Sequence, residues 1–224
     1  PAPTPQGSHA CSMAARRWST CASATTPQGA HAQRAADAGA IEAIVAALQV
    51  HPQVAGVQGV CGALGLVCSG TDAAGLARKQ RAADAGGIEA IVAALQAHPQ
   101  VAGVQQKGCL ALGNVCSGSD AAGLARNTQR AADAGGIELV VAAIQARPQV
   151  AIVQDFGCCA LFNVCFGSDA RTHAARSRRG RAARARRQRA VIAGATEAAV
   201  GAMQAHPGDA AVQRHGQRLR DLLA

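Results

Sequence analysis

The middle of the chain carries apolar residues at the spacing of a helix. Between residues 88 and 97 they recur at i, i+3, i+4 and i+7, which places them on one helix face: Ile88, Ile91, Val92 and Leu95. This helix is expected to begin after Gly86-Gly87 and to end at His98-Pro99, because proline disfavours helical geometry in the residue before it. A second long helix is predicted from about Val101 to Cys116, and a short Ala-rich helix over about residues 80–84 precedes both.

The same pattern occurs four times along the chain. Residues 81–105 read RAADAGGIEAIVAALQAHPQVAGVQ, and similar segments occupy 34–58, 130–154 and, with more changes, 189–213. The equivalent positions are Ile41, Ile88, Ile137 and Thr196, so the first two intervals are nearly equal and the last is the longest. A helical unit of this length cannot bury its apolar face alone, so the repeats predict a solenoid in which units stack on their neighbours.

Composition supports helices that approach each other closely. Of 224 residues, 56 are alanine and 25 glycine, whereas aromatic residues make up only 2%. No apolar stretch reaches the ~18–20 residues that cross a bilayer, so no membrane association is expected. Runs of alternating β-branched and aromatic residues are also absent, which argues against a β-sandwich or barrel.

One string allows a more specific comparison. Residues 85–116, AGGIEAIVAALQAHPQVAGVQQKGCLALGNVC, resemble an armadillo repeat, in which a Gly-Gly-Ile second helix precedes a third helix of the form V-Q-x-x-small-x-x-A-L-x-N-apolar-small. Residues 153–165 match the third-helix pattern again, whereas the first unit has Leu66 where asparagine is expected. The resemblance implies an all-α fold, a right-handed α-solenoid of three-helix armadillo-type repeats.

The expected units follow the repeat. We place a frayed partial repeat or linker at 1–30, repeats at 31–79, 80–128 and 129–187, and a partial capping repeat at 188–224. The third helix of the first repeat contains four glycines, at positions 56, 59, 62 and 65, each of which costs ~0.5–1 kcal/mol relative to alanine. We expect it to be the least stable of the third helices.

The resemblance implies a function as well as a fold. In armadillo proteins the third helices line a groove where asparagine side chains hold the backbone of an extended peptide, and the matching residues here are Asn114 and Asn163. An amide can donate and accept, so it can bind a peptide group of any sequence. The alternative is that both asparagines only make hydrogen bonds within the stack. The neighbouring groove candidates are Lys107, Leu110, Phe156, Cys159 and Phe166. The expected partner is therefore another protein, held by a monomer.

A cluster of arginines supports a different function. The net charge is +9, and residues 171–189 account for all of it because the rest of the chain has thirteen basic and thirteen acidic residues. This basic patch lies in the longest unit and comprises Arg171, Arg176, Arg178, Arg179, Arg181, Arg184, Arg186, Arg187 and Arg189. Three interpretations are open: a solvated loop, a patch that binds nucleic acid or acidic protein, and a nuclear-localisation signal. Without interleaved aromatic residues, nucleic-acid binding would be weak, non-specific and sensitive to salt.

Other chemistry is not indicated. The chain has no G-x-S-x-G, H-E-x-x-H, phosphate-loop or G-x-G-x-x-G motif, so we expect neither an enzyme nor a cofactor. The nine cysteines form no C-x-x-C pair and are expected to be buried thiols, a metal or disulfide role being the alternative. Histidines precede prolines at 51, 98 and 206, where the end of a helix favours a positive charge, so we expect no metal site. With no secretory signal in residues 1–30, an intracellular location is expected, either cytoplasmic or nuclear.

Overall fold

A computed structural model describes residues 27–54, 56–118, 121–166 and 178–224. These residues form twelve α-helices and no strand. The helices are α2 (Pro27–Asp37), α3 (Ala40–Val50), α4 (Val57–Val67), α5 (Ala73–Asp84), α6 (Gly87–Ala97), α7 (Ala102–Val115), α8 (Ala121–Asp133), α9 (Gly136–Ala146), α10 (Ala151–Phe166), α11 (Arg178–Ile192), α12 (Ala195–Ala205) and α13 (Ala210–Leu223). Among the described residues, no helix is both long and apolar enough to cross a membrane.

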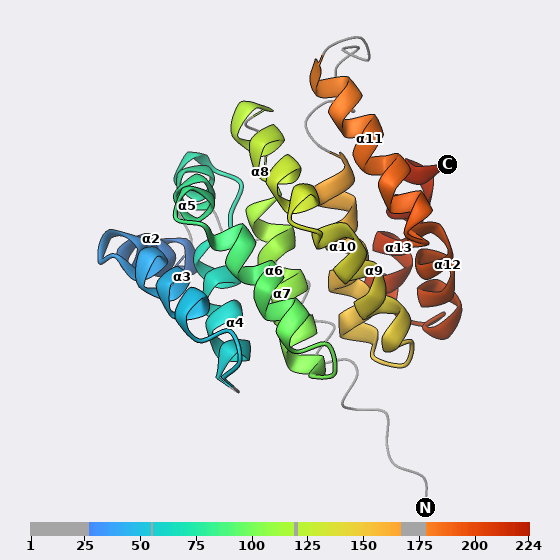
Figure 1. The fold of residues 1–224 in the computed structure, drawn as a ribbon, viewed down its shortest axis with the longest axis horizontal. Helices are drawn as coiled ribbons and strands as arrows, with labels where there is room; N and C mark the ends of the chain where they lie inside the picture. Colours follow the sequence, from blue (N-terminus) through green and yellow to red (C-terminus); the bar gives the residue numbers. More distant parts are fainter. Residues whose placement is uncertain (1–26, 55, 119–120, 167–177) are drawn as a thin grey trace, which may run out of the picture.

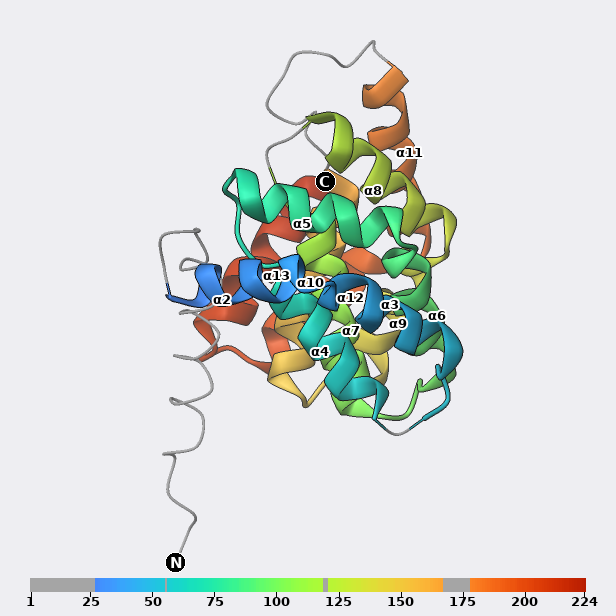
Figure 2. The same cartoon turned by 90° about the vertical axis from the view of Figure 1, so that its left-hand side faces the viewer.

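The helices recur as triplets, and each helix packs against its equivalent in the next triplet. The first helices α2, α5, α8 and α11 are in contact in that order, as are the second helices α3, α6, α9 and α12 and the third helices α4, α7, α10 and α13. The triplets therefore follow one another from α2–α4 at one end to α11–α13 at the other (Figures 1 and 2). The all-helical, repeat-like architecture predicted from the sequence is confirmed at this level.

A glycine makes each sharp corner between the first and second helix. Gly39, Gly86, Gly135 and Gly194 have φ angles of 81°, 87°, 86° and 85°, in the left-handed region that side chains with a Cβ disfavour. In two triplets the following glycine is also constrained, because a Cβ on Gly87 or Gly136 would lie 2.7 or 2.8 Å from a backbone carbonyl of the preceding helix. The first glycine is thus a requirement of this turn in all four triplets, whereas Ala40 and Ala195 replace the second glycine in the first and fourth.

A Val-Gln pair recurs in each unit, and in three of the four its glutamine caps the end of the second helix. The amide of Gln105 donates to the carbonyls of Leu95 and His98, both at 2.9 Å, at the end of α6, where carbonyls lack partners within the helix. Gln154 and Gln213 make the equivalent pairs of bonds to the ends of α9 and α12. In these three triplets the glutamine near the start of the third helix therefore joins that helix to the one before it.

One continuous apolar core runs through the stack. Isoleucine, leucine and valine side chains of the second helices meet alanines and cysteines of the third helices, and most of these residues are fully buried. The seven described cysteines are free thiols, and all but the half-buried Cys159 are buried. Small residues at the third-helix contacts let backbones approach: a Cβ on Gly65 would lie 3.3 Å from the Cα of Ala111.

The predicted helices are close to those observed, with one correction. The helices expected at 88–97 and 101–116 are α6 at Gly87–Ala97 and α7 at Ala102–Val115. The short first helix expected at 80–84 is wrong, because α5 extends over Ala73–Asp84. Its start is an N-cap that the repeat comparison overlooked: the side chain of Asp72 accepts a hydrogen bond of 3.0 Å from the backbone N–H of Gly75.

The first helices of the triplets do not coincide with the predicted boundaries between units. The boundaries drawn after residues 79, 128 and 187 fall inside α5, α8 and α11. Helices α11, α12 and α13 make a full fourth triplet, in which residues 178–192, including the end of the arginine run, provide the first helix. The expected partial repeat at 1–30 lies outside the described residues up to position 26, and α2 begins at Pro27.

Candidate functional site

The candidate peptide-binding residues form rows across the four third helices. On α7 the residues Lys107, Leu110 and Asn114 stand at i, i+3 and i+7, and on α10 Phe156, Cys159 and Asn163 repeat that spacing. The equivalents on the outer helices are Gly59, Gly62 and Leu66 of α4 and His215, Arg218 and Leu222 of α13. We call these twelve positions, with Phe162 and Phe166, the third-helix surface. All seven predicted residues are half-buried, so each is part of the fold and still accessible.

The two asparagines make the same contact in successive triplets. Asn114 donates from Nδ2 to the carbonyl of Gly65 at 2.7 Å, and Asn163 donates from Nδ2 to the carbonyl of Gly113 at 3.0 Å. Each amide is therefore fixed against the preceding third helix, as the structural alternative expected. An amide has two N–H donors and a carbonyl oxygen with two lone pairs, and this contact uses one donor. Nδ2 of Asn163 also lies 3.7 Å from Sγ of Cys159 on its own helix.

The residues beside Asn114 cover the glycines of α4. The stem of Lys107 lies over Gly62, where a Cβ would be 3.5 Å from Cδ, and Leu110 lies against Gly65 at 3.4 Å by the same measure. Leu66, the first-triplet equivalent of the asparagines, is 40% exposed. At this end the surface is apolar apart from the Lys107 ammonium.

The residues beside Asn163 are aromatic, and one of them was missed from the sequence. Phe156 packs partly against the core, and Phe166 stacks on Phe162 with ring centroids 4.8 Å apart and planes at 23°. The guanidinium carbon of Arg218 lies 4.1 Å from the centroid of the Phe162 ring. The spacing i, i+4 of the two phenylalanines could have revealed the pair, but Arg218 belongs to α13 and only packing brings it there.

A hydrogen-bonded pair that is shielded from solvent joins α10 to α13 at the His215 position of this surface. Nδ1 of His215 is in direct hydrogen-bond contact with Oδ1 of Asp155, and both side chains are largely shielded from solvent. Asp155 is the acidic residue that α10 contributes, and this contact occupies it. No local sequence pattern reveals the pair, because its members are 60 residues apart.

The arginine run divides between structural and exposed side chains. Arg186 is buried and donates to the carbonyl of Val164 at 2.9 Å and to Gln129 at 3.0 Å. Arg189 forms a paired contact with Glu138 and donates to the carbonyl of Ala132 at 2.7 Å. Arg181 and Arg184 are exposed on α11, and Arg187 is half-buried. Arg171 and Arg176 lie outside the described residues, as do the side chains of Arg178 and Arg179.

Both structural arginines repeat contacts found earlier in the chain. Arg81 and Arg130 pair with Glu42 and Glu89 and reach the carbonyls of Ala36 and Ala83, as Arg189 does one triplet later. Arg78 occupies the place of Arg186, with hydrogen bonds of 2.8 Å to the carbonyl of Val67 and to Gln33, and 2.9 Å to the carbonyl of Ser69. Arg186 and Arg189, at the end of the arginine run, thus belong to the repeat pattern and have structural contacts.

The histidines before proline also connect triplets. Nε2 of His98 lies 2.7 Å from the carbonyl oxygen of Pro52, and Nε2 of His206 lies 2.8 Å from that of Pro148. Arg147 donates to the carbonyl of Pro99 at 2.7 Å, so histidine and arginine serve as equivalent donors. No group of three or more metal-binding side chains occurs among the described residues.

One buried cation lies between α5 and α8. The Lys79 ammonium donates to the carbonyl and the hydroxyl of Ser117, at 3.1 and 2.8 Å. Burial lowers the pKa of Lys79 to about 8. The cavity beside it is only about 20 Å³, too small for a ligand larger than water.

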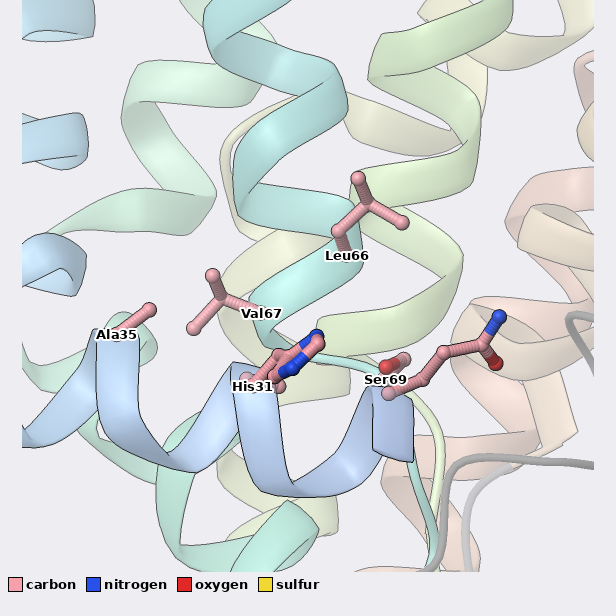
Figure 3. Close-up of a pocket in the computed structure, with 7 residues that line it drawn as sticks. His31, Ala35, Leu66, Val67 and Ser69 are labelled. Atoms are coloured by element: carbon pink, nitrogen blue, oxygen red, sulfur yellow. The ribbon is translucent and has the colours of Figure 1, made fainter. Parts of the chain in front are cut away.

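A larger pocket opens at the first end of the stack. It holds about 320 Å³ between α2 and the end of α4, and its lining is mostly apolar. Leu66 and Val67 line it from α4, and His31 and Ala35 line it from α2 (Figure 3). The pocket adjoins the Leu66 end of the third-helix surface, and nothing in the described part of the chain covers it.

Comparison with known proteins finds a similar fold in an engineered protein. No known family's sequence profile matches the chain, and no curated protein is a significant match. Among solved structures, the chain is similar to an engineered protein whose crystal structure comes from the Northeast Structural Genomics Consortium, with a TM-score of 0.54 and 23% identity. The similarity extends over 98% of this chain and 92% of that one. At this identity it concerns the fold alone.

Proposed function

We propose that this chain is a non-enzymatic, armadillo-type scaffold that binds an extended peptide segment of another protein along the third-helix surface. The observation that carries the proposal is the repeated placement of Asn114 and Asn163. Both amides are half-buried, and each is fixed by one hydrogen bond to the helix before it. A fixed amide loses less freedom when it binds a ligand, and two amides one repeat apart can hold two peptide groups of one strand.

Leu66 supplies the substitution that tests this role. Leucine occupies the asparagine position in the first triplet and α4 forms there, so Asn114→Leu combined with Asn163→Leu should leave the fold intact. The probe is a library of random twelve-residue peptides displayed on phage, selected on the immobilised protein. Peptides so selected should bind the double variant at least tenfold more weakly in fluorescence anisotropy.

The matched control removes an amide from another surface. Gln96 is exposed on α6, and Gln96→Leu should leave the affinity unchanged. Failure to select any peptide, or equal binding by the wild type and the double asparagine variant, would contradict the proposed function.

A second proposal rests on the exposed arginines of α11. Arg181 and Arg184 are exposed, and Arg126 is exposed on the neighbouring helix α8, so a weak nucleic-acid interface could form across these two helices. Binding of a labelled 20-nucleotide RNA should then fall steeply between 50 and 200 mM salt and should weaken in the Arg181→Gln, Arg184→Gln variant. Peptide affinity should not change in that variant. RNA binding that changes neither with salt nor with the two substitutions would exclude this interface.

A further inference from the structure

The third-helix surface ends in an ordered stack of two aromatic rings and one guanidinium. Phe166 lies on Phe162 with centroids 4.8 Å apart, and the guanidinium of Arg218 follows at 4.1 Å from the Phe162 centroid. Arg218 is exposed, and the structure shows no hydrogen bond from its guanidinium to any described residue. The aromatic ring therefore restricts this side chain while its donors stay available.

Arg218 stands within the rows of the candidate site. Leu110, Cys159 and Arg218 each follow the glutamine of their own Val-Gln pair at i+5, so all three occupy one repeat position on successive third helices. Helices α10 and α13, which carry Cys159 and Arg218, pack directly against each other. A segment that contacts Asn163 and Cys159 would meet Arg218 next.

The charges available to a ligand on this surface are positive. Helix α7 provides Lys107 and α13 provides Arg218, with the exposed Arg214 one turn before it, whereas Asp155, the acidic residue of α10, is held by His215. On α13, Asp221 accepts a hydrogen bond from Gln217 at 2.6 Å and lies 3.7 Å from Arg220. A carboxylate entering between α10 and α13 would thus find cations without a competing free acid.

A stacked arginine is well suited to a carboxylate. Contact of its face with a ring leaves the N–H groups at its edge, where their planar fork matches the two oxygens of a carboxylate. The ring also limits the rotamers that the long side chain must give up on binding. A lysine would lack both the stacking and the fork.

We propose that the peptide segment bound along the third-helix surface is acidic, and that Arg218, held over Phe162, binds one of its carboxylates. This inference rests on the proposed function and specifies the class of its ligand. It identifies Arg218 as the specificity-determining residue at this end of the surface.

The test uses the same random-peptide selection, followed by matched peptides and variants. Peptides selected on the wild type should be enriched in Asp and Glu. Replacing those residues by Asn and Gln should weaken binding about tenfold, and Arg218→Gln should weaken the acidic peptide about tenfold while leaving the neutral peptide unchanged. Phe162→Leu keeps an apolar side chain under the guanidinium and should weaken the acidic peptide about threefold.

Arg220→Gln is the control, because it removes the same charge from an exposed position on the same helix. Selected peptides without an acidic preference, or equal losses for Arg218→Gln and Arg220→Gln, would overturn the role of Arg218 while peptide binding itself survived. No selected peptides at all would instead reject the proposed function. Circular dichroism of each variant separates a loss of binding from a loss of fold.

Discussion

At the scale of single residues, the most informative side chains are long polar ones whose partners belong to another helix. Arg78 and Arg186 each donate through Nε to the carbonyl of a valine near the end of a third helix. In the triplet between them, Asn127 donates to the equivalent carbonyl of Val115 at 3.2 Å. A buried carbonyl without a hydrogen-bond donor is costly. All three repeat positions therefore carry a side chain that can donate, although asparagine is shorter than arginine.

Arg186 and Arg184 offer a matched pair on one helix. Arg186→Ala should lower the free energy of unfolding by about 3 kcal/mol, because it leaves the Val164 carbonyl and Gln129 without a donor and opens a cavity. Arg184→Ala, at an exposed position, should change it by no more than about 0.5 kcal/mol. Urea unfolding followed by circular dichroism measures both. Similar values for the two variants would show that Arg186 is not a structural residue.

At the scale of helices, the third helix of the first triplet differs from its equivalents. Helix α4 has 11 residues, whereas α7, α10 and α13 have 14, 16 and 14. Gln58 does not repeat the bonds of Gln105: it lies against α7, where a Cβ on Gly103 would be 2.2 Å from its Oε1. The end of α3 therefore lacks the cap that joins the other second and third helices.

Two glycine substitutions separate intrinsic helix stability from packing. Gly59 of α4 is exposed with open space around it, so Gly59→Ala should stabilise the protein by about 0.5–1 kcal/mol. Gly108 of α7 is buried, and its Cβ would lie 2.5 Å from Cδ2 of Leu95, so Gly108→Ala should destabilise it by about 1–3 kcal/mol.

Hydrogen exchange gives the local measurement for the same pair. Amides of α4 should exchange faster than those of α7 in the wild type, and Gly59→Ala should slow them. Equal exchange in α4 and α7 would contradict the expectation that α4 is the least stable third helix.

At the scale of the whole molecule, the buried thiols make stability depend on pH. Burial raises the pKa of five cysteines to about 12 and that of Cys61 and Cys159 to about 11. Unfolded thiols ionise near pH 8.5, so above that pH the unfolded state binds fewer protons than the folded state. Each thiol then lowers the free energy of unfolding by about 1.4 kcal/mol per pH unit until its folded pKa is reached.

We therefore expect the protein to lose stability as the pH rises from 8 to 10 under reducing conditions. Lys79 acts in the opposite direction, because its lowered pKa of about 8 means that deprotonation relieves the cost of burial, but one lysine is outweighed by seven thiols. Urea unfolding with a phosphine reductant at pH 7.5 and 9.5 measures the loss. Cys109→Ala should reduce the pH dependence of the free energy of unfolding by about one proton. A free energy of unfolding that does not change over this range would show that the thiols are not shielded.

Local sequence patterns were enough to predict most of the helices and their order. The i, i+3, i+4, i+7 pattern located α6, and the Gly-Gly and His-Pro pairs located its two ends, because these signals depend on residues within a few positions of each other. The length of α5 was missed because its first turn, Ala73–Leu76, has no periodic apolar face. All seven predicted surface residues lie on third helices α7 and α10, but whether they bind a peptide stays a prediction.

Which polar groups are already occupied depends instead on how the helices pack. Packing engages Arg186 and Arg189 inside the stack, fixes Asn114 to Gly65, and brings Arg218 over Phe162. In each of these contacts the two partners belong to different helices. Helical periodicity depends on residues of one helix, so it predicts which face of that helix a residue occupies. It cannot predict which residue of another helix packs against that face.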